Sequence, residues 1–286
     1  MREYEQQEVS FLQSQDTVVT YEGMPVLIKK SPTAKASGWL DEHERELMER
    51  QRAGQENTPS EPREPSVQEI RDSMGFPNRN LCTEELYTKF ETIHAGDNEV
   101  GLWRYYRRFS ERKPGKPCLI FFHGGGWMGG TPYTVENPCR LIAQLADAVV
   151  FNVDYSLAPE KKFPNGFQDC CAAVRHVWEH ADEYGVDRTK IAVGGDSAGG
   201  NLAAAVSLWD RDMGTHFIAL QVLIYPCVTM LYTGNPGYHF DLGEFEISEE
   251  QRELIDSLIC IARPQSKEDN RIEMEHVYLP NREAAY

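Results

Sequence analysis

Apolar and polar positions follow two different patterns along the chain from about residue 87 onward. Segments 89–93 and 99–106 alternate polar with apolar side chains, which is typical of strands with one exposed face. Continuous apolar runs predict strands buried on both faces, and these runs lie at 118–122, 148–153, 191–193 and 220–225. Helices are predicted between them at about 137–146, 165–184 and 198–212. This order predicts an α/β fold with a mostly parallel sheet covered by helices on both faces.

The first eighty residues have a different pattern. A short charged helix is predicted at 39–52, and the segment 53–65 is rich in Pro, Glu and Gln. Ser66 and Glu69 form a capping box, and Gly75 ends the helix that it starts. A second capping box at Ser248 opens a helix with one apolar face. We therefore expect a helical cap region at 1–80, the α/β core at 81–226, and a cap helix with a C-terminal segment at 227–286.

Composition and charge exclude several classes of protein. With 29 Lys+Arg against 45 Asp+Glu, the formal charge is −16, which repels nucleic acid and anionic membranes. The longest apolar segment, 217–232, contains Gln221 and Pro226 and falls short of the ~20 residues of a membrane span. The seven cysteines form no disulfide framework or paired zinc motif, and because no apolar run follows Met1 to Glu5 a signal peptide is not expected. We expect a soluble, cytoplasmic protein, with its oligomeric state open.

The first chemical motif is Gly195-Asp196-Ser197-Ala198-Gly199. It follows a predicted strand and opens a predicted helix, which is the setting of a nucleophile elbow. Such a turn holds the serine in a strained backbone conformation and projects its hydroxyl above the sheet, while small neighbours leave room for the chain. Ser197 is therefore the candidate catalytic nucleophile, with Gly195, Asp196 and Gly199 in supporting positions.

A second motif, His123-Gly124-Gly125-Gly126, follows the buried strand 118–122. Glycines without a Cβ allow backbone amides to face a substrate carbonyl. We expect an oxyanion hole made by the amides of Gly125, Gly126 and Ala198, with Gly124 in a supporting position. His123 is expected to orient this loop rather than to act as a base.

The same loop also satisfies a dinucleotide-binding fingerprint. Gly124, Gly126 and Gly129 have the Gly-x-Gly-x-x-Gly spacing, and Asp154 ends the next predicted strand. However, two strand patterns precede this one, and a nicotinamide site would leave the turn at Ser197 unexplained. The fingerprint is weak evidence when it stands alone, so a nicotinamide cofactor is not expected, and the cysteine spacing predicts no metal site.

Together these motifs resemble a known family. The segments that match it in order and spacing are 123–126, 154–160, 163–164 and 195–200. They resemble the hormone-sensitive-lipase family of α/β-hydrolases, over about residues 87–226. The resemblance implies an α/β-hydrolase fold with a helical cap, a serine carboxylesterase activity toward modest acyl esters, and no cofactor.

A serine hydrolase also needs a histidine base and an acid that orients it. The family has both later in the chain than the serine. The sequence continues for 89 residues after Ser197 (286 − 197), and nothing after Pro226 matches the acid motif. We therefore expect the last two strands, the acid and the histidine to be absent from these 286 residues. The histidines that do follow Ser197 are expected to be surface residues: His216, His239 and His276, the last keeping the expected order with Asp256 or Asp269.

Two functions remain open from the sequence. The leading hypothesis is a carboxylesterase that hydrolyses short- to medium-chain acyl esters through an acyl-enzyme at Ser197. The alternative is a catalytically inactive protein of the same fold that keeps its pocket for a small ligand. The intact serine and glycine motifs favour the first hypothesis, and the missing histidine favours the second. The fold alone does not decide between them.

Overall fold

Seven segments of the chain are described by the computed structural model: 6–21, 24–29, 45–46, 48–50, 65–75, 78–108 and 114–228. They belong to two units, one that includes the described residues before 65 and one that includes those from 65 to 228. Each unit is described by itself. The capping box at Ser248, and the cap helix expected in the segment 227–286, lie outside the described residues.

The N-terminal unit contains a helix and a hairpin. Helix α1 spans Gln6–Ser14, and strand β1 (Thr17–Tyr21) pairs antiparallel with β2 (Met24–Ile28). The sequence predicts only helices and a loop here, and the hairpin corrects that expectation. Residues 17–21 do not alternate strictly, and 24–28 contain Pro25, which weakens a strand assignment. The helix predicted at 39–52 coincides with helical residues at 45–46 and 48–50.

A six-stranded sheet forms the centre of the second unit, with its strands in the order β3-β4-β6-β5-β7-β8. Their bounds are β3 Leu86–Ala95, β4 Asn98–Arg107, β5 Lys116–Phe122, β6 Val149–Asp154, β7 Val186–Asp196 and β8 Leu220–Ile224. Strand β4 runs antiparallel to β3 and β6, whereas β6, β5, β7 and β8 run parallel to one another. The predicted α/β class with a mostly parallel sheet is confirmed.

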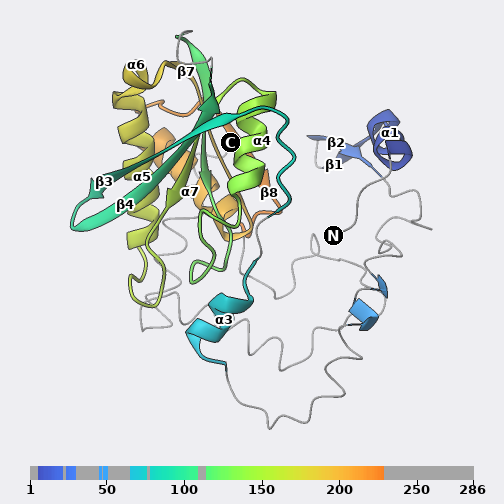
Figure 1. Cartoon of the computed structure of the whole chain (residues 1–286), viewed down its shortest axis with the longest axis horizontal. Coiled ribbons are helices and arrows are strands. Elements are labelled where there is room, and N and C mark those ends of the chain that lie inside the picture. The colour runs from blue at the N-terminus through green and yellow to red at the C-terminus, as the bar shows by residue number, and fades with distance from the viewer. Residues whose placement is uncertain are drawn as a thin grey trace. The chain divides into compact units, whose positions relative to one another are not determined.

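Helices cover both faces of this sheet (Figure 1). Helix α4 (Glu136–Leu145) packs on one face, and α5 (Asn165–Glu179) and α7 (Ala198–Met213) pack on the other. The single helix predicted at 165–184 is wrong, because α5 ends at Glu179 and a separate α6 (Ala181–Tyr184) follows. The Arg188 side chain binds the carbonyls of Trp178 and Glu179, so the end of α5 is satisfied without a continuing helix.

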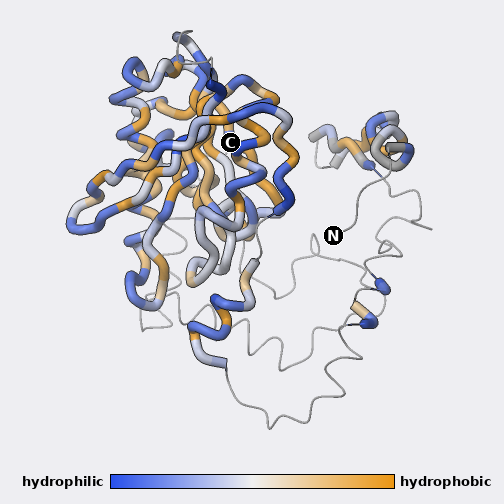
Figure 2. The backbone as a smooth tube through the Cα atoms, viewed as in Figure 1, coloured by the Kyte–Doolittle hydropathy of each residue, from blue (hydrophilic) through white to orange (hydrophobic). Residues whose placement is uncertain are grey.

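Alternate residues of β5 divide the core into two clusters. Ile120 and Phe122 belong to the larger cluster with α5 and α7, whereas Leu119 and Phe121 belong to the smaller cluster with α4. This is the period of a strand whose two faces are both covered. Figure 2 shows hydrophobic residues concentrated in the central strands. The unbroken apolar run of β5 is explained by these two buried faces.

Helix α3 (Val67–Ser73) starts at the predicted capping box. The Ser66 Oγ accepts from the Glu69 amide at 3.2 Å, and the Glu69 carboxylate accepts from the Ser66 amide at 2.8 Å. Gly75 follows the helix with φ of 84°, a left-handed value that suits glycine. The sequence assigns this helix to the cap region at 1–80, but the structure packs it with the second unit.

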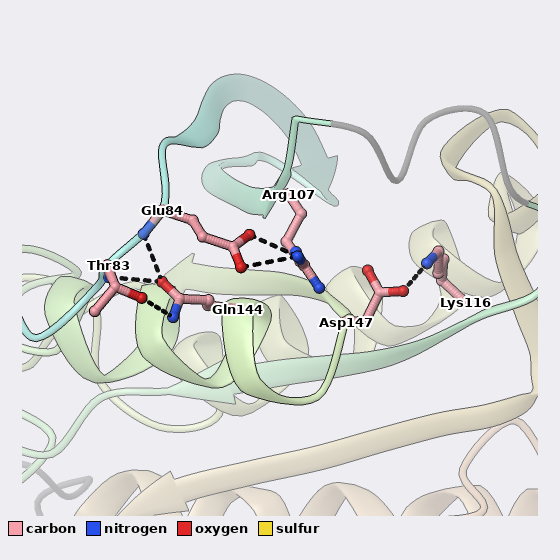
Figure 3. A network of polar contacts seen from close by, with 6 residues as sticks. All are labelled: Thr83, Glu84, Arg107, Lys116, Gln144 and Asp147. Atoms are coloured by element: carbon pink, nitrogen blue, oxygen red, sulfur yellow. Dashed lines mark hydrogen bonds and ion pairs between the residues drawn. The ribbon is translucent and has the colours of Figure 1, made fainter.

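Polar contacts fix the segment before β3 to α4 (Figure 3). The Gln144 Oε1 accepts from the backbone amides of Thr83 at 2.9 Å and Glu84 at 3.1 Å. The Gln144 Nε2 donates to Thr83 Oγ1 at 2.9 Å. Glu84 also pairs with Arg107 at the end of β4, at 2.7 Å. One glutamine side chain therefore joins the last turn of α4 to the chain that enters the sheet.

A second ion pair in Figure 3 joins Lys116, at the start of β5, to Asp147 in the turn before β6. The Lys116 side chain is 9% exposed and that of Asp147 is 44% exposed. A buried ammonium requires a partner, and Asp147 supplies it. This contact lies at the amino end of β5, opposite the end that carries the glycine loop.

No helix in the described segments is long and apolar enough to cross a membrane. Strand β8 occupies part of the apolar segment that begins at Phe217. Free thiols are carried by the described cysteines, Cys82, Cys118, Cys139, Cys170, Cys171 and Cys227.

The Gln144 contacts lead to a stability prediction. Replacing Gln144 with alanine removes three hydrogen bonds, and each such bond contributes about 1 kcal/mol. We expect Gln144→Ala to lower the free energy of unfolding in urea by about 1–2 kcal/mol, because water replaces part of what is lost. Leu145→Ala is the matched control, since Leu145 is 75% exposed on the same turn. Equal stability of the two variants would contradict this role of Gln144.

Candidate active site

Ser197 occupies a strained turn between β7 and α7. Its φ is 53° and its ψ is −115°, which is an unfavourable conformation for a residue with a side chain. Its amide donates to the Ile224 carbonyl at 2.9 Å, and its carbonyl accepts from the amides of Asn201 at 3.0 Å and Cys227 at 3.2 Å. These bonds to α7 and to the end of β8 hold the strained turn in place.

Glycine is required at position 199, just after this turn, because two segments of the chain approach closely there. A Cβ on Gly199 would overlap the carbonyl oxygen of Phe122, the last residue of β5. Strands β5 and β7 are parallel neighbours, and Phe122 pairs with Gly195 in their register. The carboxyl ends of both strands, with the loops that follow them, therefore meet at one edge of the sheet.

The loop after β5 carries the second motif, in an unusual backbone conformation. The φ angles of Gly125, Gly126 and Trp127 are 130°, 61° and 60°. The Gly125 carbonyl accepts from the amides of Met128 at 3.2 Å and Gly129 at 2.9 Å, which closes the loop on itself. Among the hydrogen bonds of the described residues, none uses the amide of Gly125, Gly126 or Ala198. Within the part of the chain that the structure describes, these three donors have no acceptor.

Asp196 joins the serine turn to the glycine loop. Its Oδ1 accepts from the Gly124 amide at 2.9 Å. Burial raises the pKa of the Asp196 carboxyl, and the bond from the Gly124 amide partly offsets that effect. The residue between Gly195 and Ser197 in the motif thus acts as the acceptor that fixes the first amide of the facing loop.

His123 is completely buried beneath the loop. Its Nδ1 lies 2.9 Å from the Gly124 carbonyl, so this nitrogen carries the proton and donates. Its ring stacks on Tyr155 at 4.4 Å between centroids, and the Tyr155 hydroxyl donates to the His123 carbonyl at 2.7 Å. Burial lowers the pKa of His123 to about 4. This is the environment of a neutral, structural histidine, as the sequence suggests, and Tyr155 is a support that the sequence did not reveal.

The described histidine that follows Ser197 is far from it along the sheet. His216 is exposed and precedes β8. Because β7 and β8 are parallel, the start of β8 lies at the opposite end from the turn that follows β7. His239 and His276, together with Asp256 and Asp269, lie outside the described residues.

The dinucleotide alternative fails on the position of the next helix. That motif binds pyrophosphate at the N-terminus of a helix that opens within the glycine loop. Here the loop with Gly124, Gly126 and Gly129 leads into turns, and α4 begins only at Glu136. The loop therefore presents backbone amides without the helix that a nicotinamide cofactor requires.

A parallel sheet with a serine turn and a glycine loop at its carboxyl edge defines a hydrolase-type α/β protein. Comparison with known proteins identifies the family: the chain belongs to the family described as alpha/beta hydrolase fold, whose model matches residues 119–269. The expected resemblance to the esterases of the hormone-sensitive-lipase family is confirmed.

Similar proteins include several esterases. Esterase LipI of Mycobacterium tuberculosis is 47% identical over 160 residues, which cover 56% of this chain and 50% of LipI. Arylacetamide deacetylase of Mus musculus is 40% identical over 133 residues, covering 43% of this chain and 33% of that protein. The chain thus spans about half the length, or less, of these curated relatives.

Solved structures give the same picture. The carboxylesterase EstE1, cloned from a metagenomic library, is 34% identical to this chain, with a TM-score of 0.62. The similarity covers 73% of this chain and 71% of EstE1. The fold around Ser197 is therefore shared with a carboxylesterase of known structure.

The Asp196 contact predicts opposite effects for two substitutions. Asp196→Ala removes the acceptor of the Gly124 amide, which costs about 1–3 kcal/mol of unfolding free energy when the donor stays buried. Asp196→Asn keeps an acceptor oxygen and removes the charge whose burial is unfavourable. We expect Asp196→Asn to be at least as stable as the wild type at pH 7, and Asp196→Ala to be less stable. Urea titration of the three proteins would test this ranking, and an Asp196→Asn protein less stable than Asp196→Ala would contradict it.

The low pKa of His123 predicts a pH dependence of stability. Its pKa of about 4 lies below the ~6.5 of an unfolded histidine, so between these values the unfolded state binds a proton that the folded state does not. Stability from this group is present above pH 6.5 and is lost as the pH falls toward 4. The full loss amounts to about 3 kcal/mol.

His123→Asn is the variant that tests this dependence. Asparagine keeps a donor for the Gly124 carbonyl and does not titrate. We expect the free energy of unfolding of the variant to fall less steeply between pH 7 and 4 than that of the wild type. Identical slopes would show that His123 is not the buried neutral group described here.

Proposed function

We propose that the chain is a serine carboxylic ester hydrolase that forms an acyl-enzyme at Ser197. The observation that carries the proposal is that the strained Ser197 turn meets the amides of Gly125, Gly126 and Ala198 at one edge of the sheet, where no other described residue binds these amides. Relatives named as esterases and carboxylesterases support it. They also make a purely ligand-binding role for the same fold less favoured.

The proposed reaction has two halves. The Ser197 Oγ attacks the ester carbonyl carbon, and its proton passes to a base while the carbonyl oxygen becomes an oxyanion. The amides of Gly125, Gly126 and Ala198 would donate to this oxyanion, and the positive end of the α7 dipole would favour it. The C–O bond to the alcohol then breaks, and the alcohol leaves with the proton. Water repeats the attack on the acyl-serine and releases the carboxylic acid and free Ser197.

The base must come from a residue other than the histidines described above. His123 is buried, its Nδ1 proton is engaged with Gly124, and its pKa is about 4. His216 is at the far end of the sheet. The family order has the acid and the histidine later in the chain than the serine, and His216 is the described histidine in that part of the chain. We therefore expect the base for Ser197, and the acid that orients it, from outside the described residues.

We propose short- to medium-chain acyl esters as substrates. The relatives in the comparisons are named as esterases and carboxylesterases, and the reaction as written uses only protein groups and water. A series of p-nitrophenyl esters from acetate to laurate measures this preference directly, with the highest kcat/KM expected at acetate to octanoate.

Substitution of Ser197 tests the function itself. In a protein that contains the base for Ser197, we expect Ser197→Ala to lower kcat for p-nitrophenyl butyrate by about 10⁴-fold or more, because removal of the nucleophile leaves only binding and the oxyanion hole. Ser207→Ala is the matched control, since among the described residues the Ser207 hydroxyl in α7 bonds the Ala203 carbonyl, at 2.8 Å. This control is expected to keep the wild-type rate within about twofold.

Labelling with a fluorophosphonate gives a second reading on the same proteins. A mass increase on the peptide that contains Ser197 is expected in the wild type and in Ser207→Ala, and none in Ser197→Ala. Hydrolysis and labelling that persist in Ser197→Ala would exclude Ser197 as the nucleophile. A wild-type chain with neither hydrolysis nor labelling would contradict the proposed esterase activity.

A further inference from the structure

Arg71 of α3 contacts the loops that follow β5 and β6, although it precedes them by dozens of residues. Its Nε donates to the Met128 carbonyl at 2.6 Å, and its Nη2 donates to the Ala158 carbonyl at 3.0 Å. The same guanidinium forms a two-bond ion pair with Glu160, at 2.8 Å from Nη1 and 2.6 Å from Nη2. Figure 1 shows α3 beside these loops.

Every nitrogen of the guanidinium has an acceptor in this arrangement. The fork geometry is specific to arginine, because lysine has a single nitrogen and cannot reach two carbonyls and a carboxylate at fixed angles. The Arg71 side chain is 22% exposed and that of Glu160 is 60% exposed. Glu160 thus orients the guanidinium from the solvent side, while the two backbone carbonyls bind it on the inner side.

The bonds of Arg71 reach the loop 123–129 at two points. Met128 is bound directly through its carbonyl, and its amide donates to the Gly125 carbonyl. Ala158 is bound through its carbonyl, and its amide donates to the Trp127 carbonyl at 2.9 Å. Met74, just after α3, packs its sulfur against Gly129. The chain just after Gly126 is therefore held by contacts that depend on α3.

This loop needs such outside support. Gly125 and Gly126 reach φ of 130° and 61° without steric cost, but glycine has little conformational preference of its own to keep them there. Trp127 has φ of 60°, which is uncommon for a residue with a side chain and persists only where the surroundings hold it. On its other side the loop is held by the Asp196 bond to the Gly124 amide. Arg71 provides the corresponding support after Gly126.

We infer that Arg71 is a positioning residue that holds the loop 123–129 in the conformation whose Gly125 and Gly126 amides face the ester carbonyl. This role rests on the proposed esterase function. Arg71 does not touch the reacting atoms; it acts through Met128 and Ala158. Helix α3 is then part of the catalytic apparatus and not only a connection to the N-terminal unit.

Arg188 supplies a matched control within the same chain. It also binds two backbone carbonyls, those of Trp178 and Glu179, and forms a two-bond ion pair with Asp182. It lies near the start of β7, at the end of the sheet opposite the Ser197 turn. Arg188→Ala therefore removes contacts of the same kind without affecting the loop 123–129.

The test compares Arg71→Ala and Arg188→Ala in the full chain by two measurements. Hydrogen exchange followed by mass spectrometry is expected to be at least tenfold faster at the amides of 123–130 in Arg71→Ala, and unchanged there in Arg188→Ala. For p-nitrophenyl butyrate, kcat is expected to fall at least tenfold in Arg71→Ala with KM within about twofold, because the hole binds the transition state more than the substrate. Arg188→Ala is expected to keep both constants.

The exchange measurement decides the inference whether or not the chain hydrolyses esters. Unchanged exchange at 123–130 in Arg71→Ala, or equal acceleration in Arg188→Ala, overturns it while leaving Ser197-dependent hydrolysis intact. If the wild type shows no Ser197-dependent hydrolysis, that result counts against the esterase function and not against the role of Arg71 in holding the loop. If Arg71→Ala does not fold, Arg71→Lys against Arg188→Lys decides, with faster exchange at 123–130 expected only in Arg71→Lys.

Discussion

The chain that leaves β7 passes so close to the end of β5 that the Phe122 carbonyl would overlap any Cβ at Gly199. This contact exists because the two strands are parallel neighbours and both turn sharply at the same edge. It sets the distance between the serine turn and the glycine loop before any side chain is considered. The Asp196 bond to Gly124 then fixes their relative orientation. The candidate site is thus first a backbone structure, and the side chains around it keep it in place.

The strain in this backbone is distributed over several unrelated segments. The Ser197 turn is held by the end of β8, through Ile224 and Cys227, and the glycine loop by Asp196 and Arg71. Strained conformations persist only where the surroundings determine them. The residues that matter for the site therefore include positions before β3 and after β7, and a substitution in α3 reaches the same loop as one at Asp196.

The strands of the second unit and both motifs could be predicted from the sequence, because continuous apolar runs and glycine-rich turns are local signals. Those signals place all six strands of the second unit and the turn at Ser197. They miss the break at His180, where Arg188 satisfies the end of α5 from another segment. They also miss the pairing of Arg71 with Glu160, 89 residues away. Contacts of this kind depend on which loops the topology brings together, and the spacing of residues along the sequence does not predict which loops those are.

Strand direction also decides which side chains can serve Ser197. In a parallel sheet, only residues at the carboxyl ends of the strands, or on segments folded over that edge, come near the turn. His216 precedes a strand, so strand direction alone excludes it as the base for Ser197. His123 lies at the correct edge, but its Nδ1 binds the Gly124 carbonyl and its ring stacks on Tyr155. In the proposed reaction, stabilisation of the oxyanion and transfer of the proton would therefore depend on different parts of the molecule. The first would come from the amides of Gly125, Gly126 and Ala198, and the second would require a side chain that another segment places over the same edge.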